Sequence, residues 1–249
     1  MVTKYASRVV NLPAPAKINL GLDLIRRRPD GFHEVATVMR EIALSDLVRI
    51  EILRSEGFGI RLEVRGPQRG RIGPAPENLC VRAAKAFFDR AGIRVGLRIG
   101  LLKRIPAGAG LGGGSSDAAA VLNGLSSLYP GRVAARGLEG LAAGLGSDVP
   151  FFLRGGTALC TGRGEKVRRI PSPGVLHLVL VLPGVGVPTA AAYRAAAVRT
   201  GWRKRIVGSR KVARLLAAGE VAAAARAVAN DLEPAALRVA LVEVQRVLT

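Results

Sequence analysis

Hydrophobic and polar residues alternate along several short stretches of the chain, and this pattern predicts β-strands. The stretch KINLGLDLI (17–25) puts four aliphatic side chains on one face and polar residues, including Lys17 and Asn19, on the other. A period of two is typical of a strand with one buried face. Residues 46–53 and 59–64 are predicted to pair as a hairpin. Strand-like patterns also cover residues 95–106, 155–170 and 175–182.

Elsewhere the apolar residues recur every three or four positions, which predicts helices. The stretch 78–92 reads as a helix closed by Gly92. In SSDAAAVLNGLSSLY (115–129), Ser115 or Ser116 is the expected N-cap, with Asp117 in the first turn. Strands and helices alternate without a regular βαβ order, so the expected fold is α+β or mixed α/β. Further helical patterns cover 138–145, 188–199, 209–218, 220–232 and 234–248.

Length and composition indicate a folded protein of one large or two small domains. The chain has 249 residues, 49% of them hydrophobic. The longest apolar stretch, 175–187, is interrupted by Pro183 and is too short to span a membrane. The N-terminus lacks the apolar core of a signal peptide, so a cytoplasmic protein is expected. Cys80 and Cys160 have no neighbouring metal ligands and are predicted to be buried free thiols.

The chain is strongly basic, with 38 Lys and Arg against 18 Asp and Glu, a net charge of +20. A positive field attracts nucleic acid and small polyanionic substrates alike. The basic residues are scattered, and an aromatic content of 4% counts against stacking on single-stranded nucleic acid. Charge alone therefore leaves both kinds of partner open.

The glycine-rich run PAGAGLGGGSSDAAA (106–120) lies between a predicted strand and a predicted helix. It lacks the lysine of a Walker-type P-loop, G-x-x-x-x-G-K-[ST]. It matches G-x-G-x-x-G at Gly108, Gly110 and Gly113, but no acidic residue follows about 20 positions later to bind a ribose. The remaining interpretation is a loop whose backbone N–H groups, with the positive end of the next helix, bind nucleotide phosphates. The hydroxyls of Ser115 and Ser116 add donors or a route to Mg²⁺.

This run resembles the central motif of the GHMP kinases. Two flanking segments, APAKINLGLDLIRRRPDGFHEVATVM (14–39) and GSDVPFFLRGGTALCTGRGE (146–165), are similar to the 4-diphosphocytidyl-2-C-methyl-D-erythritol kinases of the non-mevalonate isoprenoid pathway. Weaker matches follow in the same order, so the resemblance extends from Ala14 to the end of the chain. They are ENLCVRAA (77–84), PGVGVPTAAAYRA (183–195) and NDLEPA (230–235).

The resemblance implies an α+β, two-domain GHMP kinase fold. Residues 1–158 would form a ribosomal S5 domain 2-like half that binds ATP, and residues 159–249 a ferredoxin-like half. The implied activity is ATP- and Mg²⁺-dependent phosphorylation of the 2-hydroxyl of 4-diphosphocytidyl-2-C-methyl-D-erythritol, a cytidine diphosphate derivative. A monomer or homodimer without nucleic-acid or membrane partners is expected. Two alternatives stay open: a GHMP kinase for another small alcohol, such as homoserine or mevalonate, and a truncated, non-catalytic nucleotide- or RNA-binding relative.

The resemblance also assigns roles to residues. Phosphoryl transfer to an alcohol needs a base, which would be Asp148, and Lys17 would assist it. Residues expected to contact the substrate are Asn19, Phe32, His33, Thr189 and, more weakly, Tyr193; Tyr is common in the family at the position of Phe32. Asn78 would lie near adenine, although an N-cap explains it equally well. The residues expected to bind ATP are Asn78, Pro106, Ala107, Gly108, Ala109, Gly110, Leu111, Gly112, Gly113, Gly114, Ser115 and Ser116.

One feature of the family is absent. Its members continue into a third glycine-rich motif, SGSGP, beside the phosphates, whereas this chain ends in VEVQRVLT (242–249) within a helical pattern. The C-terminal half is therefore expected to be incomplete.

Overall fold

The structure is a computed structural model that describes residues 8–53, 57–171, 174–182, 186–197 and 208–248. The chain divides into two compact units, each discontinuous in sequence. The first comprises residues 1–16, 42–106 and 112–153, and the second residues 17–41, 107–111 and 154–249. The division into contiguous halves at residue 158 stays a prediction.

Two long strands, β1 (Val9–Arg27) and β2 (His33–Leu53), pair with each other and contribute residues to both units. In the first unit β2 pairs antiparallel with β4 (Gly96–Leu102), and β4 pairs parallel with β3 (Gly59–Arg65). The predicted hairpin of 46–53 with 59–64 is therefore wrong, because β4 lies between these strands. Alternation predicts a strand but not its partner; the helix that follows β3 in the chain permits the parallel crossover.

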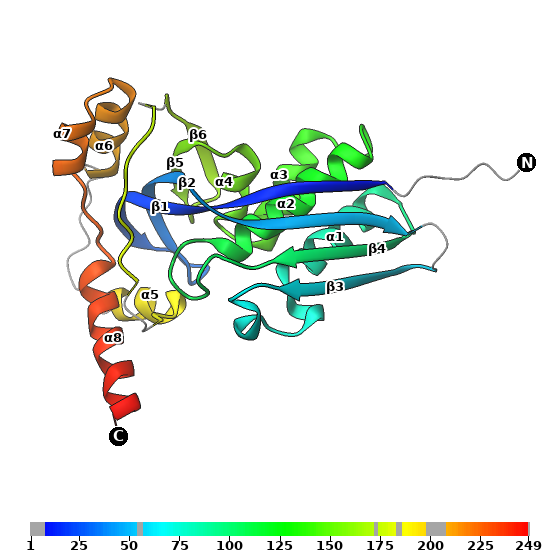
Figure 1. Ribbon diagram of the computed structural model, residues 1–249. Coiled ribbons are helices and arrows are strands. Elements are labelled where there is room, and N and C mark those ends of the chain that lie inside the picture. Colours follow the sequence, from blue (N-terminus) through cyan, green and yellow to red (C-terminus); the bar gives the residue numbers. More distant parts are fainter. Residues whose placement is uncertain (1–7, 54–56, 172–173, 183–185, 198–207, 249) are drawn as a thin grey trace, which may run out of the picture. The chain divides into compact units, whose positions relative to one another are not determined.

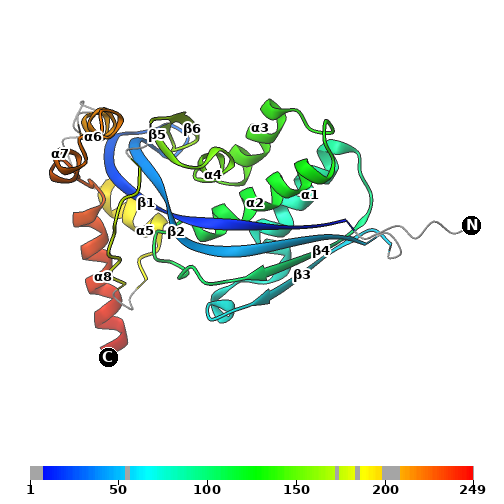
Figure 2. The same ribbon diagram turned by 45° about the horizontal axis from the view of Figure 1, so that its top comes forward.

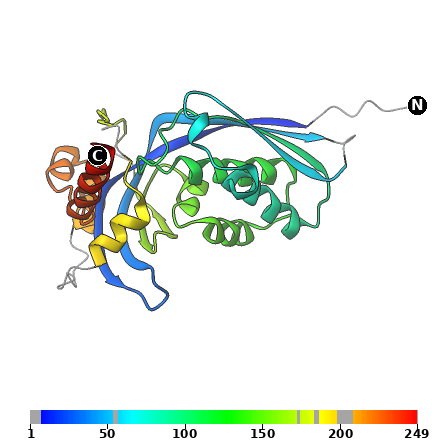
Figure 3. The same cartoon turned by 90° about the horizontal axis from the view of Figure 1, so that it is seen from below.

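Three helices of the first unit, α1 (Leu79–Ala91), α2 (Gly113–Leu128) and α3 (Ala135–Leu145), pack against one another. Figure 3 shows these green to teal helices on one face of the blue to cyan strands. Helix α4 (Val149–Arg154) and the 3-10 turns Arg69–Arg71 and Ala75–Glu77 complete the unit. Apolar side chains from the strands and helices form its core. The largest buried ones include Ile50, Leu97, Ile99, Phe87, Phe88, Leu122 and Leu125.

Helix α2 begins earlier than its sequence predicts. Its N-cap is Gly112, with φ 71°, so the expectation of a Ser115 or Ser116 cap is wrong. A left-handed cap position suits glycine, which has no Cβ to clash with the backbone. Ser115 and Ser116 therefore lie inside the helix, and Asp117 lies beyond the first turn, where it is buried.

In the second unit β2 pairs with β5 (Thr157–Gly162), and β5 with β6 (Lys166–Arg169). Among the described residues after β6, four helices follow, in the stretches where helical periodicity predicts them. Helix α6 packs beside α7, and α5 beside α8 (Figures 1 and 2). Their bounds are Thr189–Ala197 for α5, Gly208–Ala217 for α6, Val221–Arg226 for α7 and Glu233–Leu248 for α8.

The strand predicted at residues 175–182 does not form, and that prediction is wrong. The segment has no regular secondary structure, and its side chains are largely solvent-exposed, Val179 by 92%. A strand needs a neighbour to satisfy its backbone groups, and within the described ranges none pairs with this segment. A run of apolar residues is therefore not sufficient to form a strand.

Two further predictions from composition can be compared with the structure. Cys80 and Cys160 are free thiols in the interior, as predicted. Among the helices that the structure describes, none is long and apolar enough to cross a membrane.

Substitution of Gly66 should destabilise the first unit strongly. Gly66 has φ 100°, and a Cβ there would clash with the backbone carbonyl oxygen of Lys103 and lie 2.9 Å from its nitrogen. We expect Gly66→Ala to lower the free energy of unfolding by about 2 to 4 kcal/mol, measured by urea denaturation. The control is Gly59→Ala, at a glycine with open space around it; equal losses in the two variants would contradict this prediction.

Candidate active site

The glycine-rich loop has an alternating backbone. Gly108, Gly110 and Gly112 have φ values of 74°, 72° and 71°, and no described residue other than glycine has positive φ. Where left-handed residues alternate with right-handed ones, successive N–H groups point toward one side and can bind an anion. Gly112 then caps α2, whose positive dipole end reinforces this preference.

Lys17 is tied to this loop within the second unit. Its backbone N–H donates to the carbonyl of Leu111 at 2.9 Å, and its Nζ donates to Oδ1 of Asn19 at 2.7 Å. The two-residue spacing predicted that these side chains share a face, and this is confirmed. Lys17 is only 6% exposed, an unusual environment for a lysine.

A chain of hydrogen bonds fixes the amide of Asn19. Its Nδ2 donates to Oγ1 of Thr37 at 2.7 Å, and the Thr37 hydroxyl donates to the carbonyl of Gly21 at 2.7 Å. Asn19 Oδ1 is therefore turned toward Lys17. The sequence did not single out Thr37, because its part depends on pairing between β1 and β2.

Aromatic residues gather at the β1–β2 turn of the second unit. The His33 ring stacks on Tyr193 of α5, with centroids 5.2 Å apart and planes at 29°. Phe32 is 49% exposed, and the Arg163 guanidinium lies 4.7 Å from its ring centroid. Thr189 is the first residue of α5 and is exposed. Burial, with the nearby charge of Arg27, lowers the pKa of His33, which favours a neutral ring.

Sequence reasoning missed Arg163, because its position is fixed by a turn and not by a periodic hydrophobic pattern. It lies between Gly162 and Gly164, both with positive φ, in the turn from β5 to β6. Its backbone N–H donates to Oε2 of Glu165 at 2.6 Å. The sequence GRG at this turn is the signal that could have indicated a half-buried, firmly held arginine.

Asp148 belongs to the first unit and lies at the start of α4. It lies two residues after Gly146 and directly before α4. The Gly146 N–H donates to the carbonyl of Ala142 in the last turn of α3, and the Val149 N–H donates to the carbonyl of Gly146. Its side chain is half-buried. The residues after it, Val149 to Phe152, are all buried, so an apolar layer adjoins the carboxylate in sequence, as predicted.

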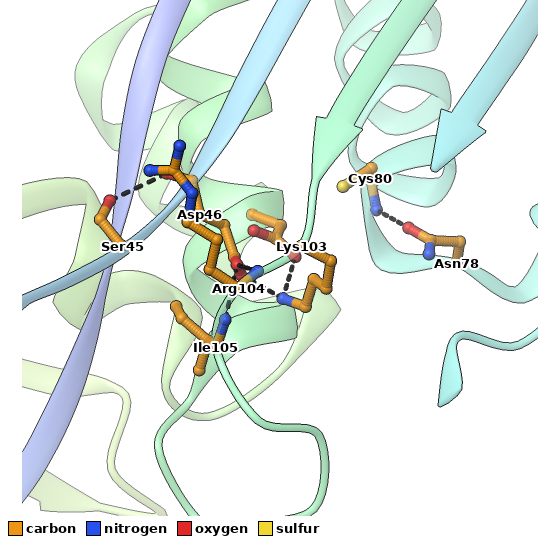
Figure 4. A network of polar contacts seen from close by, with 8 residues as sticks. Ser45, Asp46, Asn78, Cys80, Lys103, Arg104 and Ile105 are labelled. Atoms are coloured by element: carbon orange, nitrogen blue, oxygen red, sulfur yellow. Dashed lines mark hydrogen bonds and ion pairs between the residues drawn. The ribbon is translucent and has the colours of Figure 1, made fainter. Parts of the chain in front are cut away.

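Asn78 acts as the N-cap of α1. Its Oδ1 accepts from the backbone N–H of Cys80 at 2.9 Å (Figure 4). The predicted N-cap role of Asn78 is thereby confirmed. A contact between Asn78 and adenine stays a prediction.

A buried ion triad, Asp46–Lys103–Asp117, lies in the first unit, and two of its members flank the glycine-rich loop in the chain. Lys103 Nζ donates to Asp46 and, at 2.6 Å, to Oδ2 of Asp117. Asp46 also accepts from the backbone N–H groups of Arg104, at 2.5 Å, and Ile105, at 2.8 Å (Figure 4). All three charged side chains are at least 97% buried. Sequence reasoning missed the triad, since its members are 14 and 57 residues apart.

The triad strongly perturbs the pKa of Asp117. Burial raises this pKa from 3.8 to about 7; the ammonium of Lys103 opposes the rise, and the Asp46 carboxylate adds to it. Burial lowers the pKa of Lys103, but the two carboxylates outweigh burial and leave it raised. Burial also raises the pKa of the nearby Cys80 thiol, which keeps it neutral. Two carboxylates thus share one cation, and the raised pKa leaves Asp117 partly protonated near neutral pH.

Because the folded state holds this proton more tightly than the unfolded chain, stability should fall as pH rises from about 4 through 7. Asp117→Asn removes the titrating group. We expect the melting temperature of the wild type to drop more steeply than that of the variant between pH 5 and 8. Both proteins are measured by calorimetry, so that the contributions of the other titrating groups cancel in the comparison. Parallel plots of melting temperature against pH would contradict the raised pKa of Asp117.

A hollow of about 470 Å³ in the second unit contains none of the predicted site residues. It is an open depression with a basic lining, and it is not part of the candidate site. Its lining residues are Leu159, Thr161, Lys166, Val167, Arg168 and Arg210.

Comparison with known proteins decides the family. Residues 78–156 match the GHMP kinases N terminal domain. A 4-diphosphocytidyl-2-C-methyl-D-erythritol kinase from Pelotomaculum thermopropionicum is 44% identical over 230 residues, covering 92% of this chain and 78% of that protein. The chain belongs to the 4-diphosphocytidyl-2-C-methyl-D-erythritol kinase family.

Further similarities support this family and its fold. The kinase of the same name from Bacillus subtilis is 46% identical over 183 residues, covering 73% of this chain and 61% of its own. A crystal structure of 4-(cytidine 5'-diphospho)-2C-methyl-D-erythritol kinase has a TM-score of 0.67 at 38% identity, covering 92% of this chain and 78% of the other. A homoserine kinase from Cytophaga hutchinsonii has a TM-score of 0.65 at 19% identity, covering 92% of this chain and 73% of its own, and shares the fold. The expected GHMP kinase fold, with mixed helices and strands, is thus confirmed.

The kinase-family site residues fall into groups that the structure describes separately. The second unit brings Lys17, which is hydrogen-bonded to Asn19, to Leu111. It also brings His33 to Tyr193 of α5 and Phe32 to Arg163. The first unit carries Asp148 and the start of α2. Their roles in binding and catalysis stay predictions.

Proposed function

We propose that this protein transfers the γ-phosphoryl group of ATP to the 2-hydroxyl of 4-diphosphocytidyl-2-C-methyl-D-erythritol. The protein is an ATP-dependent kinase that acts on a small alcohol. The similarity to relatives named for this activity runs through 92% of the chain, which supports the same substrate.

The observation that carries the proposal is the loop of alternating φ leading into α2. ATP presents a chain of negatively charged phosphates, and this backbone offers N–H donors and the positive end of a helix dipole. Glycine at three alternate positions allows the phosphates to approach the backbone closely.

Asp148 is the proposed general base. An alcohol is a poor nucleophile at neutral pH, so the base takes the proton from the 2-hydroxyl as its oxygen attacks the γ-phosphorus. The leaving ADP departs in line with the attacking oxygen. The adjoining apolar layer, Val149 to Phe152, would limit the access of water, which would otherwise compete as the nucleophile.

Lys17 is proposed to stabilise the negative charge that develops on the reacting oxygens. Its ammonium is held by Asn19, which is itself held by Thr37, so little reorganisation is needed when the charge appears. A buried cation is worth more for this purpose than one in solvent, because the local dielectric is lower.

Phe32 and His33 are proposed to bind the cytosine ring. Phe32 supplies an exposed ring face, and a neutral His33 supplies one donor and one acceptor for the edge of the base. Tyr193 and Thr189 are proposed to complete this side of the substrate site. The positive guanidinium of Arg163 on Phe32 suits a substrate that carries a diphosphate.

The residues beside the loop fit a Mg²⁺ ion that arrives with ATP. Within the described residues no cluster of His, Cys, Asp and Glu could hold a metal by itself, and Mg²⁺ commonly binds through substrate phosphates with few protein ligands. Ser115 is half-buried at the start of α2, and the buried Ser116 Oγ has no hydrogen-bond partner within the described ranges. The ion would neutralise charge on the β- and γ-phosphates.

The proposal is tested by following ADP release with three alcohols in turn: the cytidine diphosphate derivative, homoserine and mevalonate. Turnover is expected only with the first, and only while Mg²⁺ is present rather than chelated by EDTA. Turnover with homoserine or mevalonate would overturn the substrate assignment. Absence of ATP binding, together with a salt-dependent affinity for RNA, would overturn the kinase function itself.

A further inference from the structure

The buried ion triad connects the two ends of the glycine-rich loop. Lys103 is followed by Arg104 and Ile105, which lead directly into the loop at Pro106. Asp117 lies on α2, which the loop enters at Gly113. The contacts of Lys103 with Asp117, and of Asp46 with the backbone at 104 and 105, therefore join the entry of the loop to the helix at its exit.

Helical spacing explains why glycine precedes Asp117 by four residues. Positions 113 and 117 lie on the same face of α2, one above the other. A Cβ at Gly113 would lie 2.9 Å from Lys103 Nζ and 3.0 Å from Cγ2 of Ile105. Any larger residue would push the ammonium away from Asp117, so Gly113 makes room for the triad.

Stability alone is a weak reason for such an arrangement. A buried ion pair loses much of its Coulombic gain to desolvation, and apolar residues of similar volume often stabilise a core as well. One oxygen of the triad, Oδ1 of Asp117, has no hydrogen-bond partner in the described part of the chain. What the triad does supply is a fixed orientation of the backbone, because each charge-assisted hydrogen bond holds together the two chain segments that carry its donor and its acceptor.

We propose that Asp117 and Lys103 are positioning residues for the phosphates of ATP: they hold the loop entry against the first turns of α2 and so set where the N–H groups at the start of α2 point. This inference rests on the proposed kinase function. Neither side chain needs to touch the nucleotide, since each acts through the backbone that it anchors.

The test is the KM for ATP of Asp117→Ala, compared with that of Asp117→Asn. Alanine removes the link between Lys103 and α2, whereas asparagine keeps an oxygen acceptor in the same place. We expect KM for ATP to rise about 10- to 100-fold in Asp117→Ala, with a smaller change in kcat, and to return to within about threefold of wild type in Asp117→Asn. A KM for ATP that is unchanged in Asp117→Ala would overturn the proposal.

Val121→Ala is the matched control. Val121 lies on α2 and is fully buried, but it is outside the triad and the loop. The Val121→Ala substitution should lower the melting temperature without raising KM for ATP. An equal rise in KM in the control would mean that Asp117 acts through general stability, and would overturn the positioning role.

The affinity for ADP, measured by calorimetry without turnover, separates this inference from the proposed function. Wild type that binds no nucleotide defeats the kinase function, whereas wild type and Asp117→Ala that bind ADP equally well defeat only the positioning role. If Asp117→Ala does not fold, the pH dependence of KM for ATP decides. It should differ between wild type and Asp117→Asn near pH 7, and identical profiles would overturn the proposal.

Discussion

Asp148→Asn should lower kcat by about 10²- to 10⁴-fold while leaving nucleotide binding close to wild type. The amide has the size of the carboxylate but cannot take up a proton at neutral pH. The loss should therefore appear in the chemical step rather than in KM for ATP. Steady-state ADP release gives kcat, and calorimetry with ADP gives the binding constant.

The matched control is Asp89→Asn, which removes an exposed carboxylate from α1 of the same unit. Its kcat should equal that of wild type. If Asp148→Asn retained wild-type kcat, the base would have to be another group. If it lost nucleotide binding instead, Asp148 would serve the structure of the site rather than proton transfer.

Lys17→Met should lower kcat by about 10²- to 10³-fold, because a preorganised cation stabilises charge that develops mainly in the transition state. Methionine fills a similar volume without charge, so the buried position should remain packed. The variant also removes the hydrogen bond that Lys17 Nζ donates to Asn19 Oδ1. Kinetics with both substrates varied separates the loss in kcat from any loss in substrate binding.

Lys85→Met, at an exposed position of α1, removes the same charge away from the site and should leave kcat unchanged. This control matters because the chain carries a net charge of +20, and a general loss of field would affect any anionic substrate. A rise in KM with unchanged kcat in Lys17→Met would assign Lys17 to ground-state binding and contradict its catalytic role.

Much of the local structure could be predicted from the sequence. The period of two at residues 17–25 predicted a strand with Lys17 and Asn19 on one face, and their hydrogen bond confirms it. Helical periodicity predicted α1 and its Gly92 C-cap. These signals are local, because a residue's neighbours in the pattern are also its neighbours in the structure.

Predictions that depended on distant partners were less successful. The apolar run at 175–182 has the composition of a buried strand, yet the segment pairs with no strand among the described residues. The hairpin of 46–53 with 59–64 was wrong because β4 intervenes. Strand pairing depends on contacts that are remote in the chain, and periodicity carries no information about them.

The sequence by itself determined that a glycine-rich loop joins a strand to a helix, and it indicated the kinase family through three separate motifs. Only the tertiary structure decided that α2 begins at Gly113, that Thr37 orients Asn19, and that Asp46 and Asp117 enclose Lys103. The physical reason is burial. A buried charged side chain needs a compensating charge or hydrogen bond, and tertiary contacts bring that group from a distant part of the chain, so the local sequence does not identify it.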